Sequence, residues 1–214
     1  MKKGIIFYFL LAVTLSLYAG KYAGKTILND DGSLDVVETE GTFYLGYGSK
    51  VSEVKFGSNS PKITKIILEG TAFIHDYSFI AECKNLEVLV LNTIMTENLN
   101  LDFLAKCKKL RVIAFDGVIH ATKLPNLANL ENLEYFAMTN CGLTSCSATL
   151  KHGKNLKFIN LCHNKISELP KPSSGDNALY FVSGNIIKTS KYKNYNFDSD
   201  IRKRLAEEFW AYIR

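Results

Sequence analysis

Two stretches decide the fold, residues 133–143 (LEYFAMTNCGL) and residues 156–166 (LKFINLCHNKI). Both carry apolar residues at their first, fourth, sixth and eleventh places, and a cysteine or an asparagine at the ninth. Outwards from them, segments starting at Ile63, Leu86 and Leu110 repeat much of the pattern, and a weaker copy starts at Asn177. Successive starts lie 23, 24, 23, 23 and 21 residues apart, a period that predicts an array of stacked repeats.

Two further sets of apolar columns support this alignment. One column lies six residues before the repeat starts and consists of Ile80, Leu104, Leu127 and Leu150. The other lies three residues before the repeat starts and consists of Cys83, Cys107 and Leu130. Each repeat is therefore predicted to be a short strand with its first, fourth and sixth side chains in a core, followed by a turn and a return segment. Because one repeat cannot bury that face alone, the strands are expected to stack about 4.8 Å apart in a parallel sheet.

The pattern resembles the signature of the leucine-rich-repeat family over residues 63–187. The matching residues are Leu133, Phe136, Met138, Cys141 and Leu143 in one repeat, and Leu156, Ile159, Leu161, Asn164 and Ile166 in the other. The repeats from Leu86 and Leu110 depart from it at the ninth and eleventh places. The resemblance implies an α/β leucine-rich-repeat solenoid with a curved parallel sheet, similar to short bacterial-type (internalin-like or BspA-like) secreted repeat proteins. An asparagine ladder is expected only at the C-terminal end, through Asn164 and Asn185.

Four segments follow from this alignment. Residues 1–19 have two lysines followed by an apolar run, which predicts a secretory signal peptide; an uncleaved N-terminal anchor is the alternative. Residues 20–62 show short strand patterns between turns and are predicted to form a β-rich N-terminal cap. Residues 63–187 hold about six repeats. Residues 188–214 end in an amphipathic stretch that predicts a helical C-terminal cap, and both caps would cover open sheet edges.

Charge and hydropathy restrict the location and the partners. The signal sequence predicts an exported protein, either periplasmic, at the cell surface or secreted. No second apolar stretch is long enough to cross a bilayer, so no membrane span is expected after signal removal. The net charge of +5 includes two lysines of the signal, and the remainder is too small to suggest a nucleic-acid partner.

The residues most informative about function point away from the predicted core. The third and fifth places of each strand should face the concave side, and most are apolar, while the seventh places beside them are mostly polar. This arrangement is typical of the core and rim of a protein-binding surface. The predicted partner-binding residues are Val88, Val90, Val112, Ala114, Asp116, Tyr135, Ala137, Phe158, Asn160, Leu179 and Phe181. Tyr135, Phe158 and Phe181 are the expected hot spots.

An apolar concave face is also consistent with an internal cover or with a dimer. A parallel sheet is usually buried on both sides, so residues 188–200 (KTSKYKNYNFDSD) are a candidate cover that is long enough to cross it. The same face is also suited to dimerisation.

Neither metal nor catalytic chemistry is predicted. The cysteines are Cys83, Cys107, Cys141, Cys146 and Cys162; the repeat positions favour buried thiols, with a Cys83–Cys107 disulfide as the alternative. Their spacing does not match a zinc site, so we expect no metal and no cofactor. Catalytic motifs are missing, so we expect no enzyme. The expected function is an interaction or adhesion module with a protein partner. The alternatives are a self-associating envelope protein and a secreted enzyme with a site at a cap.

Overall fold

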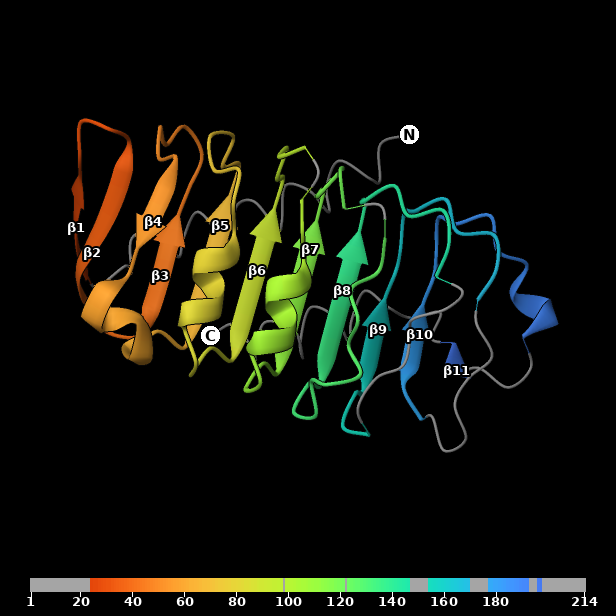
Figure 1. The fold of residues 1–214 in the computed structure, drawn as a ribbon. Coiled ribbons are helices and arrows are strands. Elements are labelled where there is room, and N and C mark those ends of the chain that lie inside the picture. The colour runs from red at the N-terminus through yellow and green to blue at the C-terminus, as the bar shows by residue number, and fades with distance from the viewer. Residues whose placement is uncertain are drawn as a thin grey trace.

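The architecture is a stack of parallel strands joined by turns and return segments (Figure 1). The computed structural model describes residues 24–97, 99–121, 123–146, 154–169, 177–192 and 196–197. Within these residues an 8-stranded sheet has the order β11-β10-β9-β8-β7-β6-β5-β3. Its strands are β3 (Thr42–Leu45), β5 (Lys65–Glu69), β6 (Val88–Asn92), β7 (Val112–Asp116), β8 (Tyr135–Thr139), β9 (Phe158–Asn160), β10 (Leu179–Phe181) and β11 (Asn196–Phe197). Every neighbouring pair is parallel.

The register of this sheet confirms the repeat alignment. The third-place residues of the six predicted repeats lie directly opposite one another, from Lys65 on β5 to Leu179 on β10. The weak sixth copy pairs in the same register, because Leu179 lies opposite Phe158. The period of the apolar pattern therefore marks a true structural repeat.

One strand of the sheet comes from the segment that the sequence analysis placed in the N-terminal cap. Strand β3 pairs with β5 so that Thr42 lies opposite Lys65 and Phe43 opposite Ile66, and Phe43 is fully buried. Its own first place is Glu40, so an apolar repeat signature cannot be recognised there. Strands β1 (Gly24–Leu28), β2 (Ser33–Thr39) and β4 (Glu53–Lys55) form a separate 3-stranded sheet with the order β1-β2-β4, at the end of the stack beside β3 (Figure 1).

Each strand of the six repeats leaves the sheet through a residue with left-handed backbone at the eighth place. These residues are Gly70, Thr93, Gly117, Asn140, His163 and Gly184, with φ between 53° and 75°. Glycine and asparagine adopt this conformation readily, whereas a β-branched residue such as Thr93 adopts it only at a cost. Thr93 is held there by its hydroxyl, which donates to Asn92 Oδ1 at 3.0 Å and accepts from Tyr47 at 3.0 Å.

The ninth places differ between the two ends of the stack. Asn164 Oδ1 accepts from the backbone N–H groups of Cys141 and Leu143, at 3.0 and 3.1 Å. Its amide nitrogen donates to three carbonyls, of Met138, Leu161 and Cys162, and Asn185 makes similar contacts one repeat later. The predicted asparagine ladder at the C-terminal end is thus confirmed.

The N-terminal repeats link their turns in another way. The buried hydroxyl of Tyr77 lies 2.9 Å from Thr71 Oγ1 and 3.3 Å from Thr96 Oγ1, and Thr96 donates to the carbonyl of Ile74 at 2.6 Å. Ile94 and Val118 occupy the ninth places of the repeats that start at Leu86 and Leu110, and both are fully buried apolar residues.

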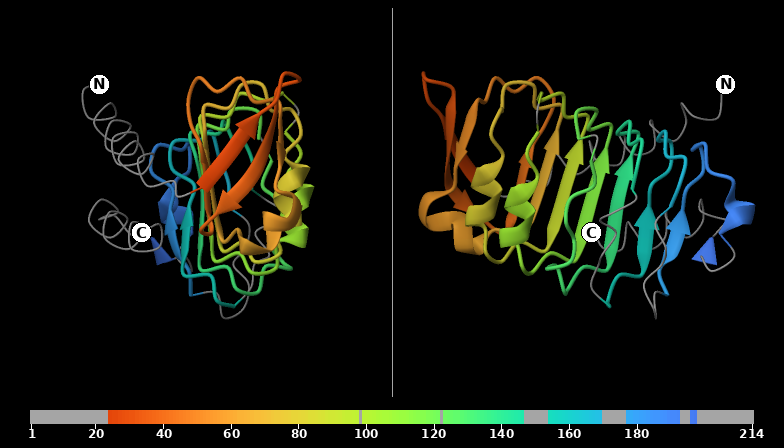
Figure 2. Two further views of the ribbon diagram at one scale, coloured as in Figure 1. Left: turned by 90° about the vertical axis from the view of Figure 1, so that its left-hand side faces the viewer. Right: turned by 45° about the vertical axis from the view of Figure 1, so that its right-hand side comes forward.

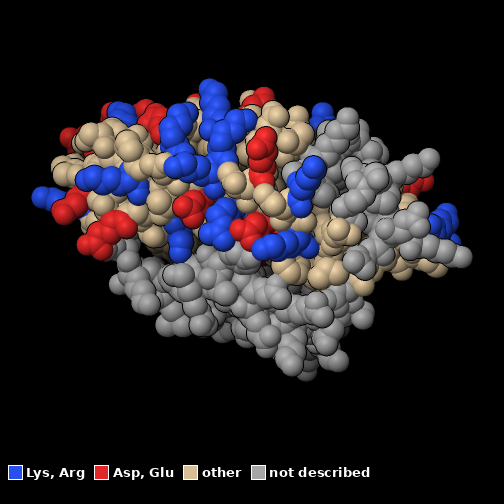
Figure 3. Space-filling model, turned by 90° about the horizontal axis from the view of Figure 1, so that it is seen from below, with Lys and Arg blue, Asp and Glu red and all other residues tan. Residues whose placement is uncertain are grey.

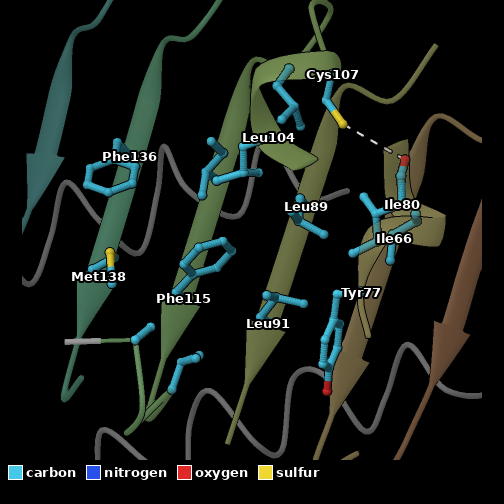
Figure 4. Packing of buried hydrophobic residues seen from close by; sticks show 14 of the residues in the cluster. Ile66, Tyr77, Ile80, Leu89, Leu91, Leu104, Cys107, Phe115, Phe136 and Met138 are labelled. Atoms are coloured by element: carbon cyan, nitrogen blue, oxygen red, sulfur yellow. Dashed lines mark hydrogen bonds between the residues drawn. The ribbon is translucent and has the colours of Figure 1, made fainter. Parts of the chain in front are cut away.

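The return segments cover one face of the sheet and close the main core. The 3₁₀ helices η1 (Gly57–Lys62), η2 (Ser78–Glu82) and η3 (Asp102–Lys106) lie on the same side of the strands (Figure 2). The inward columns meet there as predicted: Ile66, Leu89 and Phe136 from the strands pack with Ile80 and Leu104 from the return path (Figure 4). Cys107 belongs to the same packing and its thiol approaches the carbonyl of Ile80 at 3.8 Å.

The edge where the strands begin is polar and charged (Figure 3). Second-place residues of successive repeats alternate in charge, so Arg111 pairs with both Glu87 and Glu134, and Lys157 also pairs with Glu134. Exposed pairs of this kind stabilise by about 0–1 kcal/mol each. Asn85, Asn132 and Asn155 add a second set of links between repeats, because each side chain donates to a carbonyl of the repeat before it.

Two terminal predictions fall outside the described residues. These are the signal peptide at residues 1–19 and the C-terminal helix from residue 198. Before that point, η4 (Thr189–Lys191) and β11 continue the end of the stack. Among the residues that the structure describes, no helix is long and apolar enough to cross a membrane.

Candidate functional site

The sheet face opposite the return segments carries a second apolar cluster, separate from the main core. We call it the concave cluster; it comprises Ile67, Val88, Val90, Val112, Ala114, Tyr135, Ala137, Phe158, Cys162 and Phe181. Tyr44 and Leu179 pack against it and are partly buried. The structure thus brings nine of the predicted partner-binding residues together in one continuous layer, made by the third and fifth places of adjacent strands.

The side chains of this layer are buried in the structure. Val112 is fully buried, Tyr135 is 4% exposed and Phe158 is 9% exposed. Asn160, which was also predicted to bind the partner, is buried as well. The physical reason is that large apolar side chains on a parallel sheet are stabilised by exclusion from water on both faces of the sheet.

The aromatic residues form a row along the stack. The rings of Tyr135 and Phe158 lie 6.3 Å apart and are tilted by 42°, while those of Phe158 and Phe181 lie 6.4 Å apart and are nearly parallel. Rings at such separations add about 0.5–1.5 kcal/mol per pair beyond the burial of their area. Burial also raises the pKa of the Tyr135 hydroxyl. Beside this row Ala114 and Ala137 lie opposite each other on β7 and β8, where the layer is thinnest.

A polar row borders the cluster at the C-terminal ends of the strands. The buried carboxylate of Glu69 accepts from the Tyr44 hydroxyl at 2.7 Å and from the Asn92 amide at 3.1 Å. Burial and the adjacent Glu69 carboxylate raise the pKa of Tyr44, so the phenol keeps its proton and the hydrogen bond. The sequence analysis missed Tyr44, because it assigned strand β3 to the cap.

The predicted site residue Asp116 belongs to this polar row and not to the apolar layer. Its Oδ1 atom accepts from Thr139 Oγ1 and from Asn140 Nδ2, both at 2.6 Å. Burial raises the pKa of the Asp116 carboxyl, and these two hydrogen bonds oppose that shift. Asp116 therefore joins the turns of two repeats by hydrogen bonds from neutral groups.

The cysteines have no site-like arrangement among the described residues. All five are free and buried. Burial raises the pKa of the Cys107, Cys146 and Cys162 thiols to about 11, and a thiol that keeps its proton is a poor nucleophile and a poor metal ligand. In the described part of the chain no three metal-binding side chains come together.

Comparison with known proteins adds a distant structural likeness. No family model and no curated protein matches the chain. Among solved structures, the chain is similar to an internalin from Listeria monocytogenes, with 15% sequence identity, a TM-score of 0.34, and coverage of 77% of this chain and 69% of that one. The protein's own geometry defines its class. Aligned parallel strands, a left-handed eighth residue and an asparagine ladder make it a leucine-rich-repeat-like solenoid.

Proposed function

We propose that the chain is a protein-interaction module that binds its partner through the concave cluster. The observation that carries this proposal is the presence of a second apolar layer on a solenoid whose main core is already complete. The stack itself needs only the inward first, fourth and sixth places to be apolar. Outward valines and aromatic residues repeated over five strands therefore point to contact with another apolar surface.

The proposal includes an exported location and no catalytic role. Support for export comes from the two lysines and apolar run of residues 1–19. Support for a non-catalytic role comes from Glu69, Asp116 and the five cysteines, because the two carboxylates accept hydrogen bonds from neighbouring side chains and the thiols are buried. An adhesion or recognition module of this kind requires neither a metal nor a cofactor.

A pair of matched variants tests the proposal. A photoreactive residue at position 158 in the full chain would first capture the partner from the native organism. Tyr135→Leu with Phe158→Leu should then weaken binding of the captured partner by at least about 2 kcal/mol, because aromatic anchors carry that much of an interface. The control is Phe136→Leu with Ile159→Val, on the same strands but facing the main core.

Both pairs should lower stability, so affinity is compared for the folded fraction only. The control pair should leave that affinity unchanged. Equal affinities for the two double variants would overturn the concave cluster as the binding surface.

A further inference from the structure

The entries to strands β5, β6 and β7 carry a group of lysines at the edge where the strands begin. We call it the basic edge; it comprises Lys62, Lys84, Lys106, Lys108 and Lys109, all of which are exposed. Lys84 and Lys108 occupy equivalent places in adjacent repeats, because Val88 and Val112, which follow them on the strands, lie opposite each other. Lysine and arginine side chains gather over the middle of this edge (Figure 3).

The charges of the neighbouring second places are compensated, whereas those of the basic edge are not. Arg111 forms ion pairs with Glu87 at 3.7 Å and with Glu134 at 2.8 Å. Within the part of the chain that the structure describes, no acidic side chain forms an ion pair with a lysine of the basic edge. Like charges on adjacent repeats repel one another, so a bound anion would remove an unfavourable interaction there.

The backbone that presents these lysines is held by hydrogen bonds between repeats. Asn85 Nδ2 donates to the carbonyl of Pro61 at 2.7 Å, and Asn132 Nδ2 donates to the carbonyl of Lys108 at 3.0 Å. The Lys109 ammonium group donates to Asn85 Oδ1 at 2.8 Å and so adds a further link. Because the turns are fixed before any ligand arrives, binding orders only side chains.

We propose that the basic edge binds a linear anionic polysaccharide that runs across the entries of successive strands. The three entries span two strand spacings of about 4.8 Å each, so a short stretch of polymer contacts all of them. Lysine ammonium groups are point charges on flexible stems, which suits a row of carboxylate or sulfate groups whose positions vary along the polymer.

The apolar residues of the surface favour this partner over a protein or a membrane. In the described part of the chain, the large apolar side chains that are exposed lie in β1, in β2 or in turns that follow the strands of the main sheet. The basic edge therefore offers neither the aromatic anchors of a protein interface nor apolar side chains that would enter a bilayer. The choice of a polysaccharide over a nucleic acid rests on the exported location in the proposed function.

Binding of fluorescent dextran sulfate to the full chain tests the proposal. Affinity should fall as salt rises, because a polyanion releases condensed counterions when lysines replace them, and uncharged dextran should not bind. Lys84→Gln with Lys108→Gln should weaken binding at least about tenfold at about 0.15 M salt and make the salt dependence less steep. Both changes are at exposed positions, so the denaturation midpoint should stay the same.

The control removes the same charge elsewhere on the surface. Lys165 and Lys188 are exposed and lie in the segments that follow strands β9 and β10, and Lys165→Gln with Lys188→Gln should leave the affinity nearly unchanged. Equal losses in the two double variants, or no binding of dextran sulfate to the unaltered chain, would overturn the basic edge as a polyanion site.

Two further probes decide the chemical class of the partner. Tighter binding to polyglutamate, or to vesicles of phosphatidylcholine and phosphatidylglycerol, than to dextran sulfate would overturn the choice of a polysaccharide. The assay contains no protein partner. A failure of the concave cluster to bind a captured protein would therefore contradict the proposed function and leave the result for the basic edge unchanged.

Discussion

The turns at the two ends of the solenoid perform one task with different chemistry. In the C-terminal repeats a single side chain, Asn164, makes five hydrogen bonds to turn backbone. In the N-terminal repeats the ninth places are Thr71 and the apolar Ile94 and Val118, and Tyr77 links Thr71 to Thr96 through its hydroxyl. An asparagine ladder satisfies backbone groups directly, whereas the tyrosine mainly connects side chains. Each C-terminal turn should therefore depend strongly on its single asparagine, whereas the contribution to stability is spread over several side chains at the N-terminal end.

The largest expected effect is that of Asn164→Leu. The substitution removes the acceptor of two buried N–H groups, those of Cys141 and Leu143, and the donor to the Met138 carbonyl, and each unsatisfied buried group costs about 1–3 kcal/mol. The carbonyls of Leu161 and Cys162 keep Asn185 and the Asn140 N–H as donors. We expect a loss of about 3 kcal/mol or more in the free energy of unfolding, measured by chemical denaturation. A loss no greater than that of Cys141→Ala, at the ninth place one repeat earlier, would show that the ladder is dispensable.

Glycine at the eighth place gives the next effect. A Cβ atom at residue 184 would lie 2.6 Å from His163 Nδ1 and 3.2 Å from His163 Cα, and φ is +75°. Gly184→Ala should therefore cost about 2 kcal/mol, from left-handed strain of about 1–2 kcal/mol together with this contact. Gly117→Ala is the matched control, since its φ is +64° and its nearest neighbour is 3.6 Å away. In thermal unfolding, the midpoint temperature of Gly184→Ala should be lower than that of Gly117→Ala. The reverse order would contradict the predicted clash with His163.

A smaller effect is expected for Thr96→Val in the N-terminal turns. The change removes the hydroxyl that bonds the carbonyl of Ile74 and lies near the Tyr77 hydroxyl. Because Tyr77 keeps Thr71 as a partner, the loss should be about 1 kcal/mol. If Thr96→Val lowered the free energy of unfolding as much as Asn164→Leu in the same denaturation assay, the proposed difference between the turns at the two ends would be wrong.

The smallest effect concerns Asp116, between the two types of turn. Burial raises the pKa of its carboxyl, so the folded state binds the proton more tightly than the unfolded state, whose value is about 3.9. Stability from this group is therefore greatest at pH below that value, and is lost as the pH rises through the folded-state pKa. Asp116→Asn keeps an acceptor for Thr139. It should raise the free energy of unfolding at pH 7, by less than about 1 kcal/mol. A stability profile between pH 3 and 7 with the same slope for both proteins would contradict the raised pKa.

The sequence alone determined the repeat period, the inward columns and the place of the asparagine ladder. An inward position must be apolar in every repeat because each repeat buries the same face, so Leu133 and Leu156 reveal the phase of the whole stack. The ladder was equally readable, since Asn164 and Asn185 occupy equivalent places. The left-handed eighth place was missed because glycine, threonine, asparagine and histidine share no obvious property there.

Only the tertiary structure decided which outward side chains are buried and where the repeats begin. Strand β3 joins the sheet through backbone hydrogen bonds, and its side chains carry no pattern that predicts this pairing. Of the side chains of β3, only that of Phe43 is fully buried. The spacing of Val112, Tyr135 and Phe158 gives the side of the sheet on which they stand. Whether that side meets water depends on the contacts of whatever lies over the sheet. Local periodicity carries no information about such contacts.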